Sequence, residues 1–208
     1  MSQTPQSNQA LADLRRRLDS IDDRLLDLLA ERARAMDEVR AAKAAEGGPD
    51  LRLVRPGREL TILRRLIGRI KGPLPADLVV RLWRDIMASL TRLQGPFAVA
   101  VLKSESEPSV MALARQHFGQ STPLLTASSP AQVFARLDDG RAQIALLPTP
   151  EDAPELDWWR NLDPAGLQVV ARLPVDGTET QPGALVVGRQ PFDESGADRG
   201  LLVVVAET

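Results

Sequence analysis

Two basic residues near the N-terminus, Arg32 and Lys43, are spaced so that they could bind an anionic ligand together. Apolar residues at Leu11, Leu18 and Leu25 repeat every seven residues, and the next position of that series is Arg32. A charge in an apolar seam needs partners. Lys43 follows three helical turns plus about 20° later, so both cations project from one face, roughly 16 Å apart. Solvated charges on an arginine-rich helix are the alternative interpretation.

Further polar residues would complete such an anion site. Arg15 lies near the start of the same segment, Arg58 and Glu59 open the next one, and Gln94 ends the third. Each has an ordinary alternative: a solvent-facing arginine, a helix-dipole partner at Glu59, and a polar cap at Gln94. Together they offer guanidinium groups, an ammonium, an amide and one carboxylate. Because the guanidinium fork binds both oxygens of a carboxylate, the set predicts catalysis by orientation and electrostatic stabilisation.

The overall composition argues against several other kinds of site. The 208 residues include no Cys and one His, His117, which excludes thiol nucleophiles and Cys-based zinc sites and argues against a His-centred triad or metal site. No apolar run approaches the roughly 18–20 residues that span a bilayer. The polar start MSQTPQSNQ does not have the pattern of a signal peptide. We therefore expect a cytoplasmic protein with no bound metal and no membrane partner.

Charge divides the chain at Gly95. Residues 1–95 hold 18 basic against 13 acidic residues, a balance of +5, whereas residues 96–208 hold 8 against 15, a balance of −7. Such a difference in net charge indicates two regions of different character in one chain. We expect a domain over residues 8–95 and another over residues 96–208.

Three helices are predicted in the basic part. Alternating three- and four-residue spacing of apolar residues predicts a helix over about 8–45, which Gly47–Pro49 ends. Two more are predicted over about 56–70 and 76–94, each opened by a proline. At 1.5 Å per residue the first is about 57 Å long, and the others are about 22 and 28 Å. Since these cannot cover the first, we expect a second copy of the chain to do so in an intertwined homodimer.

The acidic part alternates β-rich runs with helical stretches. The runs cover residues 97–102, 123–126, 142–147, 167–173, 184–188 and 201–205, and the helical stretches lie at about 109–117 and 131–137. This alternation predicts a small α/β domain with a parallel sheet. The whole chain is thus expected to be a multidomain α+β protein. The last run ends near Thr208 without a closing element, as expected of a truncated chain.

The basic part resembles the all-helical AroQ class (type II) of chorismate mutases over about residues 8–94. The motifs that carry the resemblance are Leu14–Asp22, Leu25–Arg32, Val39 with Lys43, Arg55–Glu59, and Trp83–Met87 through Gln94. Members of this family rearrange chorismate to prephenate in phenylalanine and tyrosine biosynthesis, by an intramolecular Claisen-type step without a cofactor. The resemblance therefore implies an all-helical, intertwined dimer with that activity and with chorismate as substrate.

The resemblance also implies a role for each polar residue. Arg32 and, from the other subunit, Arg15 would hold the two carboxylates of the substrate. Lys43 and Gln94 would donate to the ether oxygen as the C–O bond breaks. Glu59 would accept from the ring hydroxyl.

Arg58 would support this site from the first turn of the second helix. Two positions depart from the family pattern. An acid often precedes the Arg–Glu pair by three or four residues, where this chain has Arg55, and a serine often lies four residues before the glutamine, where it has Leu90 beside Ser89. We expect the departures to affect affinity more than reaction type, because the charge-stabilising residues remain.

The acidic part more faintly resembles the prephenate dehydratase domain of bifunctional proteins. Segments that follow its order are Val99–Leu102, Ala112–Gly119, Val133–Ala135, Ile144–Pro148 and Leu185–Arg189. Its Gly-Thr-Phe-Ser type stretch is replaced by Glu105–Ser109, and its Thr-Arg-Phe signature by Pro182–Ala184. We therefore expect a degenerate domain, regulatory or vestigial, without dehydratase activity.

Two other functions stay open at this point. An isochorismate pyruvate lyase would keep the helical fold but release pyruvate. A non-catalytic, regulatory helical dimer would use its basic face to bind an acidic partner or nucleic acid. Acids alternate with arginines along the first helix, as at Glu31 and Arg34, and no stacking aromatics accompany them. A solvated face explains these charges better, so no nucleic-acid partner is expected.

Overall fold

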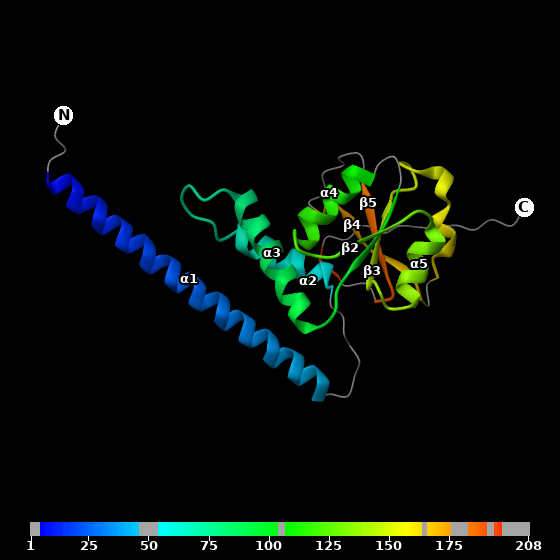
Figure 1. Cartoon of the computed structure of the whole chain (residues 1–208), viewed down its shortest axis with the longest axis horizontal. Coiled ribbons are helices and arrows are strands. Elements are labelled where there is room, and N and C mark those ends of the chain that lie inside the picture. Colours follow the sequence, from blue (N-terminus) through cyan, green and yellow to red (C-terminus); the bar gives the residue numbers. More distant parts are fainter. Residues whose placement is uncertain are drawn as a thin grey trace, which may run out of the picture. The chain divides into compact units, whose positions relative to one another are not determined.

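The computed structural model describes residues 5–45, 54–103, 107–163, 166–175, 183–190 and 194–196. Three helices precede a five-stranded sheet with its own helices (Figure 1). The chain forms two compact units, residues 1–51 and 52–208. The expected fold class, an all-helical part followed by a small α/β part, is confirmed. The run predicted at 201–205 lies outside the described residues.

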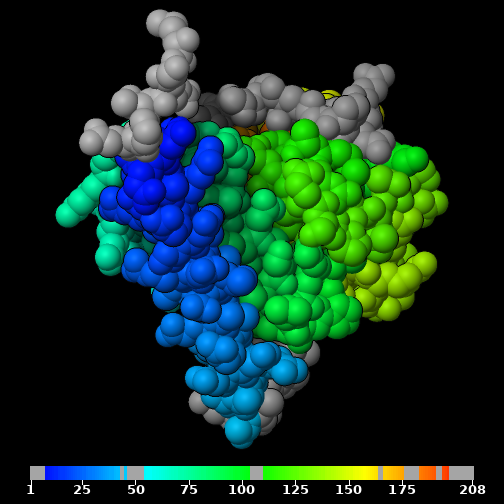
Figure 2. All heavy atoms as spheres, turned by 60° about the vertical axis from the view of Figure 1, so that its left-hand side comes forward, coloured from blue at the N-terminus to red at the C-terminus, as the bar shows by residue number. Residues whose placement is uncertain are grey.

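The described part of the first unit is one long helix, α1 (Pro5–Ala45). Its 41 residues extend over about 61 Å. The apolar stripe predicted from the sequence is open to solvent, and Leu18 is 60% exposed. Its other exposed members include Leu11, Leu14, Ile21, Leu25 and Leu28. Figure 2 shows this helix from one side as a column of blue spheres. An amphipathic helix of this kind needs another surface to bury its stripe.

Helices α2 (Pro56–Ile67) and α3 (Ala76–Gln94) pack against each other in the second unit. Pro56 occupies the first turn of α2, where a missing N–H has no cost. The prediction that this helix runs to about residue 70 was wrong, because it ends before Gly68, a residue of low helix propensity. Buried positions of α3 are Val79, Arg84, Met87 and Leu90. An arginine therefore lies on the buried face of α3.

The sheet is mixed, with strand order β2-β1-β3-β5-β4. The strands are β1 (Val99–Leu102), β2 (Leu124–Ala127), β3 (Ile144–Pro148), β4 (Gln168–Leu173) and β5 (Ala184–Gly188). Strands β1, β2 and β3 run parallel as predicted, but β5 runs antiparallel to β3 and β4. Only residues 174–183 join β4 to β5, which is too short for the crossover that a parallel neighbour requires. The prediction of a parallel sheet was therefore wrong at β5.

Side chains of each strand alternate between two apolar layers. Val99 and Val101 of β1 face α4 (Glu107–Phe118), whereas Ala100 and Leu102 face α5 (Pro130–Asp138). Two short 3-10 turns, Pro154–Leu156 and Trp158–Asn161, add the buried ring of Trp158 to the α5 layer. Since both faces of the sheet are covered, β1, β3 and β5 are buried throughout.

Helix α3 packs closely on the end of α4. Gly119, which follows α4 with φ +83°, has little room for a side chain, since an added Cβ would lie 3.1 Å from Ala88 Cβ and from Asp85 Oδ1. Arg92 of α3 donates to Thr122 Oγ1 at 3.1 Å and to Ser121 Oγ at 2.7 Å. The helix that carries Gln94 is thereby fixed to the α/β part of the second unit.

Candidate active site

Three of the predicted site residues lie on α1. The side chain of Arg32 is partly buried, and within the described part of the chain its buried Nη1 has no hydrogen-bond partner. Burial lowers the pKa of the Arg32 guanidinium below its usual value. Arg15 is exposed, and the side chain of Lys43 lies outside the described residues. A buried donor without a protein acceptor is what a carboxylate-binding arginine is expected to show before its ligand arrives.

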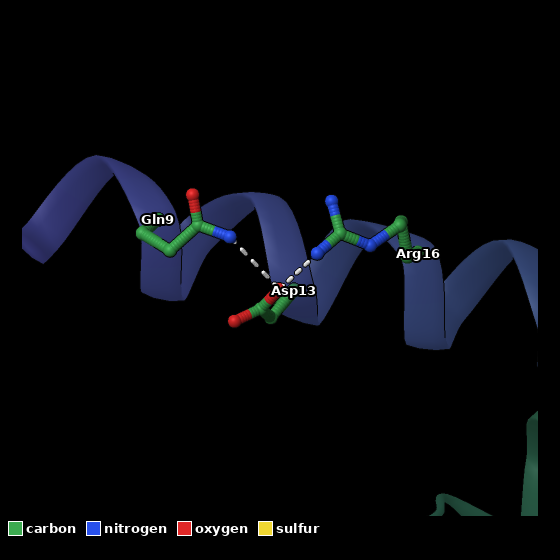
Figure 3. A network of polar contacts seen from close by, with 3 residues as sticks. All are labelled: Gln9, Asp13 and Arg16. Atoms are coloured by element: carbon green, nitrogen blue, oxygen red, sulfur yellow. Dashed lines mark hydrogen bonds and ion pairs between the residues drawn. The ribbon is translucent and has the colours of Figure 1, made fainter.

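Some of the charged side chains near Arg15 form pairs with each other within α1. Arg16 donates to Asp13 Oδ1, which also accepts from Gln9 Nε2 at 3.4 Å (Figure 3). These three side chains form the solvated, salt-bridged pattern expected of an exposed helix face. The charges of Asp13 and Arg16 are therefore paired within the helix, whereas no such pair is formed by Arg15 among the described residues.

The other three predicted residues lie on α2 and α3. Arg58 is exposed and Glu59 is partly buried, side by side in the first turn of α2. Gln94 is the last residue of α3, and its Nε2 donates to the carbonyl of Leu90 at 3.4 Å. In this single chain the amide of Gln94 therefore contacts a carbonyl of the last turn of α3. Because Arg15, Arg32 and Lys43 belong to the first unit, the assembly of all six into one site stays a prediction.

Sequence reasoning missed a buried polar cluster around Glu59. Arg84 of α3 is 7% exposed and donates from Nη1 to His117 Nδ1 of α4. His117 Nε2 lies 3.9 Å from Glu59 Oε2 and has no hydrogen-bond partner in the described part of the chain. Arg84 falls four residues after Val80 and three before Met87, so helical spacing places it beside two apolar residues of α3. That spacing was the available signal for it, whereas nothing local to His117 indicates its neighbours.

Burial and the nearby Arg84 charge hold the pKa of His117 well below its ordinary value of 6.5. The folded chain therefore keeps a neutral imidazole where the unfolded chain takes up a proton. As pH falls below about 6.5 the unfolded state gains that proton first, so this group lowers the free energy of unfolding with falling pH, by up to about 1.4 kcal/mol per unit.

We expect this loss to disappear in His117→Gln, which has no titrating group. Urea unfolding at one protein concentration between pH 7.5 and 5.5, for the wild-type chain and the variant, measures the difference between their slopes. Parallel slopes would show that His117 titrates alike in the folded and unfolded states.

Three further findings concern metal ligands, cavities and membrane-crossing helices. Among the residues that the structure describes, no three His, Asp or Glu side chains come together as metal ligands. A pocket of about 230 Å³ lies against α3, α4 and the end of β4, and Arg81, Arg84, Gln116 and His117 are among its lining residues. No described helix combines the length and apolar character needed to cross a membrane.

Comparison with known families assigns the helical part. Residues 14–95 match the family model of type II chorismate mutase. This stretch contains α2, α3 and all of the six predicted residues. The sequence of residues 14–95 is thus similar to type II chorismate mutases. No solved structure matches the chain.

Relatives of the chorismate mutase segment are longer proteins. The bifunctional chorismate mutase/prephenate dehydratase of Stutzerimonas stutzeri is 36% identical over 140 residues, which make up 66% of this chain and 38% of that protein. The protein of the same name from Neisseria gonorrhoeae is 30% identical over 163 residues, 78% of this chain and 42% of its own length. Matches of this length cannot fit within residues 1–95, so they continue into the α/β part. This chain spans about two fifths of the length of these curated relatives.

Proposed function

We propose that residues 8–95 form a chorismate mutase domain that rearranges chorismate to prephenate. The observation that carries the proposal is the match of residues 14–95 to type II chorismate mutase. The buried, unpartnered Nη1 of Arg32 supports it, because a dicarboxylate substrate would supply the acceptor that the described part of the chain lacks. The basic charge of this half, +5 by count of its residues, also favours a doubly anionic ligand.

The proposed mechanism uses orientation and charge and has no covalent intermediate. Arg32 and a partner's Arg15 hold the two carboxylates, which brings the two ends of the substrate within bonding reach. Lys43 and Gln94 donate to the ether oxygen, where negative charge grows as the C–O bond breaks and the new C–C bond forms. Gln94 must leave its contact with Leu90 to do so.

Glu59 accepts from the ring hydroxyl in this proposal, and Arg58 supports it from the same turn. Neither step needs a nucleophile, a titrating base or a cofactor. A sequence without cysteine and with a single histidine is therefore chemically sufficient for this reaction.

We further propose that the active form is a homodimer. The apolar stripe of α1 is exposed in the single chain, and a second α1 offers a surface of matching length and pattern. The dimer would bury the leucines of this stripe and bring Arg15 of one subunit to the site of the other. The proposed boundary between the mutase domain and the α/β domain, near residue 95, follows from the charge division and not from contacts, since α2 and α3 share a compact unit with the sheet.

Product analysis tests the proposal directly. Purified full chain should remove chorismate, followed by loss of its absorbance, and chromatography should show prephenate. Release of salicylate and pyruvate from isochorismate, without prephenate from chorismate, would assign the lyase reaction. Salt-dependent binding to duplex DNA with no turnover of either substrate would favour a non-catalytic dimer.

Dehydratase activity is not part of the proposal. The relatives carry that activity in their names, but this chain has Pro182–Ala184 where the dehydratase signature is expected. We expect no phenylpyruvate when prephenate is supplied. That the α/β part is regulatory or vestigial, and that the protein is cytoplasmic, stay predictions.

A further inference from the structure

The imidazole of His117 connects the α/β part to the helix that carries Glu59. It projects from α4, is 7% exposed, and meets the ring of Phe118 edge-on at 4.5 Å between centroids. Its two nitrogens face two other helices, Nδ1 towards Arg84 of α3 and Nε2 towards Glu59 of α2. Three helices thus converge on the single histidine of the chain.

The partner of Nδ1 determines where the proton of this imidazole resides. A guanidinium can only donate, so Nδ1 accepts from Arg84 and carries no hydrogen. The ring is neutral because burial and the Arg84 charge lower the pKa of His117. The one remaining proton is therefore on Nε2, which is a buried donor without a hydrogen-bond partner in the described residues.

The Glu59 carboxylate is a candidate acceptor for this donor. The distance from Nε2 to Oε2 is 3.9 Å, longer than a hydrogen bond. A shift of the carboxylate by about 1 Å, or one bridging water, would complete the contact. Polar contacts of catalytic groups are commonly long before the substrate binds and shorten in the complex.

We propose that His117 is a positioning residue for the chorismate mutase reaction, whose Nε2–H orients the Glu59 carboxylate towards the substrate. The inference rests on the proposed function, in which Glu59 accepts from the ring hydroxyl. With one carboxylate oxygen held by the imidazole, the other oxygen is directed to the hydroxyl. Arg84 acts one step further away, because it fixes the tautomer of His117. The α/β part thereby contributes to substrate binding from α4.

The test compares two replacements of His117 in the full chain. His117→Phe keeps a ring for packing but removes both polar nitrogens, whereas His117→Gln keeps one acceptor and one donor. A hydrogen bond to a charged group corresponds to about a ten- to hundredfold change in affinity. We expect His117→Phe to raise KM for chorismate by about that factor, with a smaller change in kcat. The KM of His117→Gln should lie close to that of the wild-type chain.

A general loss of folded protein gives a different result, because it lowers the apparent kcat and leaves KM unchanged. Val110→Ala is the matched control: Val110 is fully buried on α4 and does not belong to the cluster. We expect this variant to unfold at a lower temperature with an unaltered KM. An unaltered KM in His117→Phe, or a KM raised equally in Val110→Ala, would overturn the inference.

A spectroscopic readout keeps the inference testable if His117→Phe does not fold. The chain has one histidine, so its imidazole gives a single pair of 15N signals. We expect the proton on Nε2, and a shift of the Nε2 signal in Glu59→Gln. A proton on Nδ1, or no shift, would contradict the geometry. A wild-type chain without mutase activity would overturn the proposed function and the inference together. An active wild-type chain whose KM is unaltered in His117→Phe would overturn the inference alone.

Discussion

Replacing Arg32 with alanine is expected to lower kcat for chorismate rearrangement by about 10²–10³-fold, the scale for removing one preorganised donor. Burial lowers the pKa of this guanidinium, and its buried Nη1 has no hydrogen-bond partner among the described residues. A buried donor without an acceptor raises the free energy of the ligand-free protein, and a bound carboxylate removes this cost by accepting its hydrogen bond. Initial rates of chorismate loss over a range of substrate concentrations measure the effect.

Arg34→Ala is the matched control on the same helix. Arg34 is exposed and lies about 200° around α1 from Arg32, so its removal should leave the rate unchanged. Arg32→Lys keeps the charge without the two-pronged donor and should give an intermediate rate. If Arg32→Ala reacted as fast as the wild type, the carboxylate site would have to lie elsewhere.

Local patterns in the sequence account for most of the secondary structure. The three- and four-residue spacing of leucines predicted α1, and the prolines at 56 and 75 marked the starts of α2 and α3. These signals are local, since helix periodicity and caps act within a few residues. The direction of β5 was predicted wrongly because the alternation of strands and helices does not determine how a strand that follows a short connection pairs. The connection before β5, residues 174–183, is too short for a parallel crossover, and its length therefore indicates an antiparallel strand.

Some residues of the candidate site could be predicted from local sequence patterns, whereas others depend on contacts between distant parts of the chain. Arg32 was recognised because it interrupts a regular stripe, and Glu59 because it opens a helix beside Arg58. The contact of Glu59 with His117 joins residues 58 positions apart and depends on how α4 packs. No spacing rule reaches that far. A lone histidine in a helix is also found more often as packing than as function, so its residue type gave no signal.

The exposed stripe of α1 leads to the second large prediction, which concerns where each site obtains its cations. Arg15→Ala and Arg32→Ala homodimers are each expected to be nearly inactive, because every site of either dimer lacks one carboxylate-binding arginine. In a mixed dimer, however, one site lacks both arginines and the other lacks neither. This holds only if Arg15 and Arg32 of one site come from different subunits.

Mixing the two inactive variants should therefore restore activity. With statistical exchange, half of the dimers are mixed and half of their sites are intact, so about one quarter of all sites recover. The measurement is the rate of chorismate loss after the two variants are unfolded together and refolded, compared with wild type treated alike. The control mixes Arg32→Ala with the double variant Arg15→Ala/Arg32→Ala, a pair that cannot form an intact site. No recovery in the first mixture would place both arginines of a site on one subunit, because each mixed dimer would then carry two defective sites.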